Sequence, residues 1–165
     1  MSSSTPEGLT ASVLTVSDSC ARGERADLSG PAIAEALRKG KFSIIATEVV
    51  ADDESAIQKA LVRLATSARL VVTTGGTGIA ERDVTPEATK AICDRLLEGI
   101  AERMRAEGAK KTPFAALSRA VCGIHGKSLI LNLPGSPRGA VESLEAVIDV
   151  LPHVLQLLSG NTQHT

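Results

Sequence analysis

The chain has 165 residues, of which 43% are hydrophobic and 22% are charged, with a formal net charge of −1 at pH 7. This size and balance predict one globular domain with a hydrophobic core and no strong electrostatic field to attract nucleic acid or an anionic membrane. Tyrosine and tryptophan are absent and only two phenylalanines occur, so stacking of single-stranded nucleic acid on aromatic rings is excluded as a function.

Predicted strands and helices alternate along the chain. An unbroken apolar run at 70–74 is typical of a buried parallel strand, whereas Pro31 and Gly40 mark the start and end of a helix. In chain order, the predicted elements are a strand at 13–17, a loop at 18–28, a helix at 29–39, a strand at 42–50, a helix capped by Asp52 or Asp53, a strand at 70–74, helices at 86–94 and 98–107, a hairpin of 121–124 and 128–132 that turns at Gly126, and a helix after Pro137 that splits at Pro152 and ends at Gly160.

This order predicts the α/β class, with a mostly parallel sheet, helices on both of its faces and a small β-hairpin. Ligands of such sheets bind outside the carboxyl ends of the strands. The loops that begin at Ser17, Thr73 and Leu133 all leave those ends and are rich in Ser, Thr, Gly and Asp. The functional residues are therefore expected along this one edge.

The third of the predicted strands runs into a glycine-rich turn. The turn consists of Thr74, Gly75, Gly76, Thr77 and Gly78. A helix begins near Thr85-Pro86-Glu87, so backbone N–H groups are expected to converge on one point that binds phosphate. Asp83 precedes that helix, where a carboxylate facing bound phosphate would hold Mg²⁺. The spacing is not that of a Walker A loop or a dinucleotide fingerprint, and a purely structural turn remains an alternative.

Further acidic and hydroxyl residues lie in the other loops of this edge. Asp52 and Asp53 open a helix, where either is expected to act as a cap or as a second carboxylate near Mg²⁺. The first loop holds more candidates for ligand binding, namely Ser17, Asp18, Asp27, Ser29 and Gly30. The hydroxyl groups among them either donate to phosphate or satisfy the local backbone.

A second strand–turn–helix sequence occurs at Pro134, Gly135 and Ser136. Ser136 as N-cap and Pro137 in the first helical turn explain it structurally. The same helix N-terminus is also a second candidate site for an anion.

The cysteines and the ends of the chain indicate its environment. Cys20, Cys93 and Cys122 occur singly and in odd number, which favours a reduced cytoplasmic protein in which they are small hydrophobic residues. The N-terminal residues carry no secretory pattern, and no apolar stretch reaches the length of a membrane span. We expect a disordered segment at 1–10, one domain at 11–160 and a tail at 161–165.

Taken together, four ordered motifs resemble the molybdopterin adenylyltransferase family, which includes the G domains of plant and animal molybdenum-cofactor proteins. The resemblance extends over about residues 11–160. Its motifs are Val16-Ser17-Asp18 with 27–31, Thr74–Gly78 with 82–89, the segment 112–119, and 133–137.

The resemblance implies a three-layer α/β/α sandwich that assembles as a homotrimer. It also implies that the terminal phosphate of molybdopterin attacks the α-phosphate of ATP, with Mg²⁺ required and pyrophosphate released. The catalytic and metal-binding aspartates of the family correspond to Asp83 and Asp52. Gly75–Gly78 would bind phosphate, and Pro134–Ser136 would form part of the pterin site. The product would pass to the molybdate-insertion enzyme, with no nucleic-acid or membrane partner.

Two points stay open at this level. The sequence Ala51-Asp52-Asp53-Glu54 departs from the family pattern by one residue of register, so Asp53 remains an alternative to Asp52. A non-catalytic pterin-binding or scaffold protein and a relative acting in the later molybdate-insertion step remain alternatives to the enzyme. The segment 82–87 favours the enzyme, because a protein that only binds pterin needs the glycines but not the acid.

Overall fold

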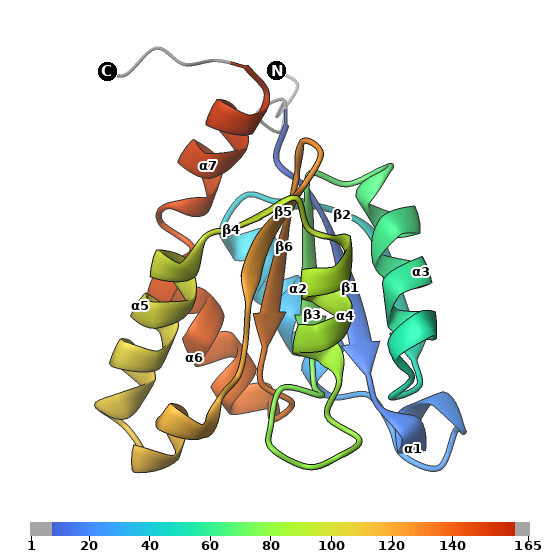
Figure 1. Ribbon diagram of the computed structural model, residues 1–165. Coiled ribbons are helices and arrows are strands. Elements are labelled where there is room, and N and C mark those ends of the chain that lie inside the picture. The colour runs from blue at the N-terminus through green and yellow to red at the C-terminus, as the bar shows by residue number, and fades with distance from the viewer. Residues whose placement is uncertain (1–7, 161–165) are drawn as a thin grey trace.

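The computed structural model describes residues 8–160 (Figure 1). The predicted tail at 161–165 and most of the predicted disordered segment at 1–10 lie outside this range. The elements are β1 (Thr10–Val16), α1 (Asp18–Ala21), α2 (Ser29–Lys39), β2 (Ser43–Val50), α3 (Glu54–Ala65), β3 (Leu70–Thr74), α4 (Thr85–Ile92), β4 (Arg95–Leu96), α5 (Glu98–Ala109), the 3₁₀ helix η1 (Pro113–Leu117), β5 (Cys122–His125), β6 (Ser128–Leu133), α6 (Pro137–Val147) and α7 (Leu151–Leu158).

One mixed sheet runs through the molecule in the strand order β2-β1-β3-β6-β5-β4. Strands β2, β1, β3 and β6 are parallel, whereas β5 pairs antiparallel with β6. The two strands of this hairpin are joined at Gly126, whose φ of 60° is accessible to glycine at little cost. The predicted mostly parallel sheet with a small hairpin is confirmed.

Helices cover both faces of the sheet, which makes the predicted three layers (Figure 1). Helices α3 and α4 enclose one core around Leu14, Leu61 and Ile130. Helices α2, α5, α6 and α7 enclose the other core, which includes Leu37 and Leu144. Full burial of one such leucine contributes about 1.5–3 kcal/mol, so the two cores hold the strand ends, and the loops that leave them, in fixed positions.

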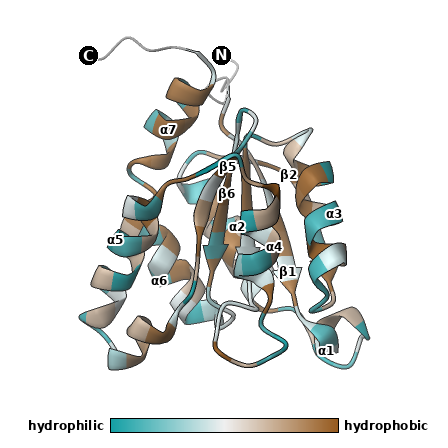
Figure 2. Ribbon diagram, in the orientation of Figure 1, coloured by the Kyte–Doolittle hydropathy of each residue, from teal (hydrophilic) through white to brown (hydrophobic). Residues whose placement is uncertain are grey.

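The C-terminal helical segment divides where the sequence predicts. Helix α6 ends at Val147, and α7 begins at Leu151 with Pro152 in its first turn, where proline's missing N–H group has no cost. Figure 2 shows that α7 is strongly hydrophobic, and its Leu151 and Leu155 are buried in the core. No helix within residues 8–160 is both long enough and apolar enough to cross a membrane.

Three short elements were not predicted from the sequence. Helix α1 lies inside the predicted loop at 18–28, β4 has two residues, and η1 has five. Elements of this length contain too few residues to show a hydrophobic period. Two of them, α1 and η1, are stabilised instead by local hydrogen bonds to single side chains. Thr112, for example, caps η1 by accepting a hydrogen bond from the backbone N–H of Phe114 at 3.2 Å.

The cysteines are free thiols that differ in burial. Cys122 is buried, as predicted, and burial raises its pKa to about 12. Cys93 is partly buried, and the same cause raises its pKa to about 11. Both therefore remain protonated and unreactive at neutral pH.

From a fully buried position in β6, Asn132 connects β3, α4 and the residue that precedes β5. Its side-chain nitrogen donates to the hydroxyls of Thr73 and Thr89, both at 3.0 Å, and its side-chain oxygen accepts from the N–H of Val121 at 3.1 Å. Asn132→Ala leaves these groups buried without partners, so we expect the free energy of unfolding to fall by about 3–5 kcal/mol in urea titrations. The control Gln156→Ala removes an exposed amide and should change it by less than about 0.5 kcal/mol. Equal losses of stability in the two variants would mean that the buried hydrogen bonds of Asn132 do not stabilise the fold.

Candidate active site

The carboxyl ends of β1, β3 and β6 meet at Gly75. Its φ is 96°, and a Cβ atom there would collide with the carbonyl oxygen of Val16 at the end of β1. A Cβ on Gly135, just after β6, would lie 3.4 Å from the Cα of Gly75. Glycine is needed at Gly75 because three backbone segments approach one another here. This contact places the loops after all three strands at one edge, as predicted.

Hydrogen bonds hold the turn after β3 in shape. The N–H of Gly75 donates to the carbonyl of Leu133 at 3.1 Å, and the Thr74 hydroxyl donates to the carbonyl of Pro134 at 2.7 Å. On the other side, the hydroxyl and N–H of Thr85 donate to the carbonyls of Gly75 and Gly76 at 3.0 and 3.1 Å. Thr74 is fully buried, and its hydroxyl joins the loops after β3 and β6.

The N-terminus of α4 differs from the expectation that it offers several free N–H groups. The N–H of Thr85 is bonded to Gly76, and Pro86 has no N–H. The first two residues of α4 therefore contribute no free N–H group to the predicted convergence of donors. The turn at 76–78 remains the candidate source of phosphate donors in this region.

Asp52 and Asp83 approach the turn from different loops. A Cβ on Gly76 would lie 3.4 Å from Oδ1 of Asp52. One on Gly78 would lie 2.8 Å from Oδ2 of Asp83. The same Oδ2 accepts a hydrogen bond from the N–H of Ala80 at 3.0 Å, which fixes its direction. The structure thus brings the two predicted carboxylates to two glycines of one turn, Gly76 and Gly78.

The structure separates the roles of the neighbouring aspartates. The Asp53 side chain accepts from the N–H of Ala56 at 2.8 Å and caps α3, and the residue is exposed. Asp52 instead exchanges hydrogen bonds with Asp18: the N–H of each donates to the carboxylate of the other, at 3.0 and 2.9 Å. Asp52 is the one that reaches Gly76, and Asp18 holds it there.

The Asp52 carboxyl is partly buried, and burial raises its pKa above the usual value. The N–H of Asp18 opposes this shift by donating to the carboxylate, whereas the charges of Asp18 and Asp83 add to it. The positive charge of Arg82 also opposes the shift, but it is the smallest of these contributions, so negative charge predominates beside the turn. A divalent cation would relieve this repulsion, and carboxylate oxygens are the ligands that Mg²⁺ prefers.

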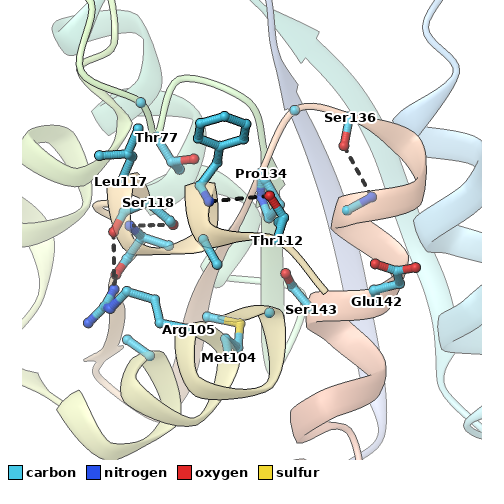
Figure 3. A pocket seen from close by; sticks show the side chains of 18 of the residues that line it. Thr77, Met104, Arg105, Thr112, Leu117, Ser118, Pro134, Ser136, Glu142 and Ser143 are labelled. Carbon is cyan, nitrogen blue, oxygen red and sulfur yellow. Dashed lines mark hydrogen bonds between the residues drawn. The ribbon is translucent and has the colours of Figure 1, made fainter. Parts of the chain in front are cut away.

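The larger of two clefts at this edge has a volume of about 580 Å³. Figure 3 shows Thr77 and Leu117 on one side of it, Ser136 and Glu142 on the other, and Met104 at its base. Its walls come from the turn after β3, α5, η1 and the start of α6. The predicted residues among its lining are Gly76, Thr77, Gly78, Asp83, Pro134, Gly135 and Ser136.

A second cleft of about 340 Å³ lies between β1 and the start of α2. The predicted residues in its lining are Ser17, Asp27, Ser29, Thr74, Gly75, Gly135 and Ser136. Gly135 and Ser136 border both clefts, so the clefts adjoin. Two adjoining cavities suit a site that brings two small molecules together.

Several predicted ligand-binding residues have internal partners. The Asp27 carboxylate accepts from the Thr15 hydroxyl at 2.8 Å and from the Gly30 N–H at 2.9 Å. Ser17 caps α1 by accepting from the Cys20 N–H at 3.2 Å. Ser136 caps α6 by accepting from the Gly139 N–H at 3.1 Å. Asp18, Gly30 and Asp52 are absent from the linings of both clefts. Ser17 therefore satisfies the local backbone, which was one of its two expected roles, and Asp27 and Gly30 are bonded to each other.

Sequence reasoning gave no role to most of the larger cleft's wall. Phe114 and Leu117 on η1 are 73% and 50% exposed, and Ile79 in the opposite loop is 74% exposed. These large apolar side chains make the mouth of the cleft hydrophobic beside its polar turn. The family motif at 112–119, which contains Phe114 and Leu117, was the available signal.

Comparison with known proteins decides the family. A family model described as a probable molybdopterin binding domain matches residues 12–153. The chain belongs to this family. Molybdopterin adenylyltransferase of Helicobacter pylori is 46% identical to this molybdopterin-binding domain over 153 residues, or 90% of the chain and 87% of the relative. The enzyme of the same name from Escherichia coli K12 is 38% identical over 164 residues, or 90% and 84%.

Solved structures agree with the fold of this molybdopterin-binding domain. The molybdopterin biosynthesis enzyme MoaB from Thermus thermophilus is 52% identical and superposes with a TM-score of 0.87, covering 92% of this chain and 97% of that one. The resemblance to molybdopterin adenylyltransferases and the three-layer fold are therefore confirmed.

Proposed function

We propose that this protein is a molybdopterin adenylyltransferase of molybdenum cofactor biosynthesis. The terminal phosphate of molybdopterin attacks the α-phosphate of ATP, a P–O–P bond forms between them, and pyrophosphate leaves. The observation that carries the proposal is the pair Asp52 and Asp83, which flank a glycine turn beside two adjoining clefts. The names of relatives that are up to 46% identical support the substrates.

The chemistry of this reaction explains the residues at the site. Two phosphate groups repel each other, so the barrier is chiefly electrostatic and no attacking side chain is required. We assign the backbone N–H groups of residues 76–78 to the phosphates, and Asp52 and Asp83 to Mg²⁺. When bound, Mg²⁺ neutralises phosphate charge.

The acidic residues suit a Mg²⁺ ion that is shared with the substrate better than a metal ion held by protein ligands alone. Within residues 8–160, no group of three or more His, Cys, Asp or Glu side chains is placed to hold a metal ion. Mg²⁺ commonly needs only one or two carboxylates, because substrate phosphates and water complete its ligands. Asp52 and Asp83 meet that requirement from two separate loops.

The proposal extends to the setting of the reaction. We infer a cytoplasmic homotrimer that passes its product to the molybdate-insertion enzyme and has no nucleic-acid or membrane partner. The family resemblance supports the trimer and the transfer of product. Free cysteines, low net charge and scarce aromatic residues support the cytoplasmic location and the absence of those partners.

The proposed reaction is tested by pyrophosphate release from purified protein. Release should require ATP, Mg²⁺ and molybdopterin together, and each omission serves as a control. Molybdopterin bound without any release of pyrophosphate would instead support the non-catalytic binding protein. Pyrophosphate formed at the same rate without molybdopterin would show a different acceptor.

The neighbouring aspartates provide a matched pair of variants. Asp52→Asn removes a charge that we assign to Mg²⁺, so kcat should fall about 100-fold or more. Asp53→Asn should leave kcat within about twofold, because asparagine caps a helix as well as aspartate does. Initial rates at saturating substrates measure both. A larger loss in the Asp53 variant would move the metal-binding role to that residue.

A further inference from the structure

Arg119 joins both ends of the loop that carries Asp83. Its Nε donates to the carbonyl of Gly78 at 2.8 Å, and its Nη2 donates to the carbonyl of Asp83 at 2.7 Å. Its own backbone N–H donates to the carbonyl of Thr77 at 2.9 Å. One residue, from the segment between η1 and β5, thus holds the loop at its start and at its end.

The guanidinium group is also paired with the helix that follows this loop. Glu87 on α4 accepts from Nη1 at 2.7 Å and from Nη2 at 3.2 Å. Two carbonyls and a carboxylate therefore occupy its donors in one plane, an arrangement that the rigid guanidinium fits and a lysine ammonium cannot. With its charge paired and four of its five N–H groups bonded to the loop and to Glu87, Arg119 is placed to hold the loop.

The segment around Arg119 is itself held from the wall of the larger cleft. Arg105 on α5 donates from Nη1 to the carbonyl of Ala120 at 3.0 Å and approaches that of Ser118 at 3.5 Å, as Figure 3 shows. These carbonyls lie on either side of Arg119. A continuous set of contacts therefore runs from α5 through Arg119 to the Asp83 loop.

We propose that Arg119 is a positioning residue, which fixes the loop at 78–83 and thereby the direction of the Asp83 carboxylate. The inference rests on the proposed function, because it takes Asp83 as the carboxylate that holds Mg²⁺. Arg119 acts through Asp83 and does not contact the substrates. Ala80 supports this role locally, since its N–H orients Asp83 within the same loop.

The loop itself can be tested without the reaction. Glu81 is exposed at its tip, so a glutamate-specific protease reports how often the loop opens. Arg119→Gln should accelerate cleavage after Glu81 by about tenfold or more. The control Arg103→Gln removes an exposed ion pair with Asp149 and should leave the rate unchanged. Unchanged cleavage in the Arg119 variant would overturn the inference.

Kinetics then test whether the loop acts on catalysis through Asp83. In Arg119→Gln, kcat should fall about 10- to 100-fold, because displacement of a catalytic group by about 1 Å has that effect. The KM for ATP should change little, and Arg119→Lys should not restore activity. Combined with Asp83→Asn, the Arg119 change should lower kcat no further.

Other kinetic results would contradict this role. Multiplied losses in the double variant, or activity restored by lysine with a raised KM for ATP, would show that Arg119 acts on the phosphates independently. If Arg119→Gln fails to fold, Glu87→Gln provides a second variant, because it removes the charge that pairs with Arg119 and keeps the size of the side chain. It should also accelerate cleavage after Glu81 and lower kcat, by smaller factors. If wild-type protein shows no turnover, the proposed function is wrong, while the cleavage rates still decide whether Arg119 holds the loop.

Discussion

Asp83→Asn is expected to lower the adenylylation rate by about 100- to 1,000-fold, the usual effect of removing one group that stabilises charge in a transition state. Asparagine keeps the size of the side chain and an oxygen that accepts from the Ala80 N–H. The loop should therefore remain in place while the charge is lost. Initial rates at several Mg²⁺ concentrations measure the loss, and binding of molybdopterin should be largely unaffected.

Asp94→Asn is a matched control for this variant. Like Asp83, Asp94 is a loop residue whose carboxylate accepts from a backbone N–H, in this case that of Gly126 at 2.8 Å. It is exposed and lies at the hairpin end of the sheet. Its rate should stay within about twofold of the wild-type rate. Turnover retained in Asp83→Asn would show that this carboxylate has no part in the reaction.

Gly75→Ala is expected to destabilise the protein by about 3–5 kcal/mol. An L-residue at a φ of 96° is strained, and its Cβ would collide with the carbonyl oxygen of Val16. The strand ends would have to separate, so both clefts should lose their shape. Urea denaturation measures the change in the free energy of unfolding, and calorimetric titration with MgATP measures the loss of binding.

Gly99→Ala makes the same chemical change where space is open. No heavy atom lies within 4 Å of the Cβ position at Gly99, and the residue lies in the first turn of α5. Alanine there should be neutral or should stabilise the protein by up to about 1 kcal/mol. Similar destabilisation in both variants would mean that close packing at Gly75 is not what requires glycine.

The longer elements could be predicted because they carry their own signals. Residues 70–74 form a short run of leucine, valine and threonine that is buried throughout, and Ile57, Leu61 and Leu64 recur at helical spacing and pack into one core. Pro152 marked the division between α6 and α7 correctly. The parallel order of the sheet followed from the alternation of these elements, and with it the edge that bears the site.

The details of the site could not be obtained in this way, because they depend on contacts distant in sequence. The choice between Asp52 and Asp53 follows from the approach of Asp18, which lies 34 residues away. Arg119 reaches Gly78 and Asp83 across 41 and 36 residues. The N–H of Thr85 is not a free donor, because the turn at Gly76 folds back onto it.

The central claim is that two phosphates react directly with each other, without an attacking side chain. ATP labelled in its α-phosphate, incubated with molybdopterin, Mg²⁺ and the wild-type protein, tests it most directly. We predict that the label moves to molybdopterin, one for each pyrophosphate released, and that none becomes attached to the protein. Label bound covalently to the protein during turnover would contradict the account.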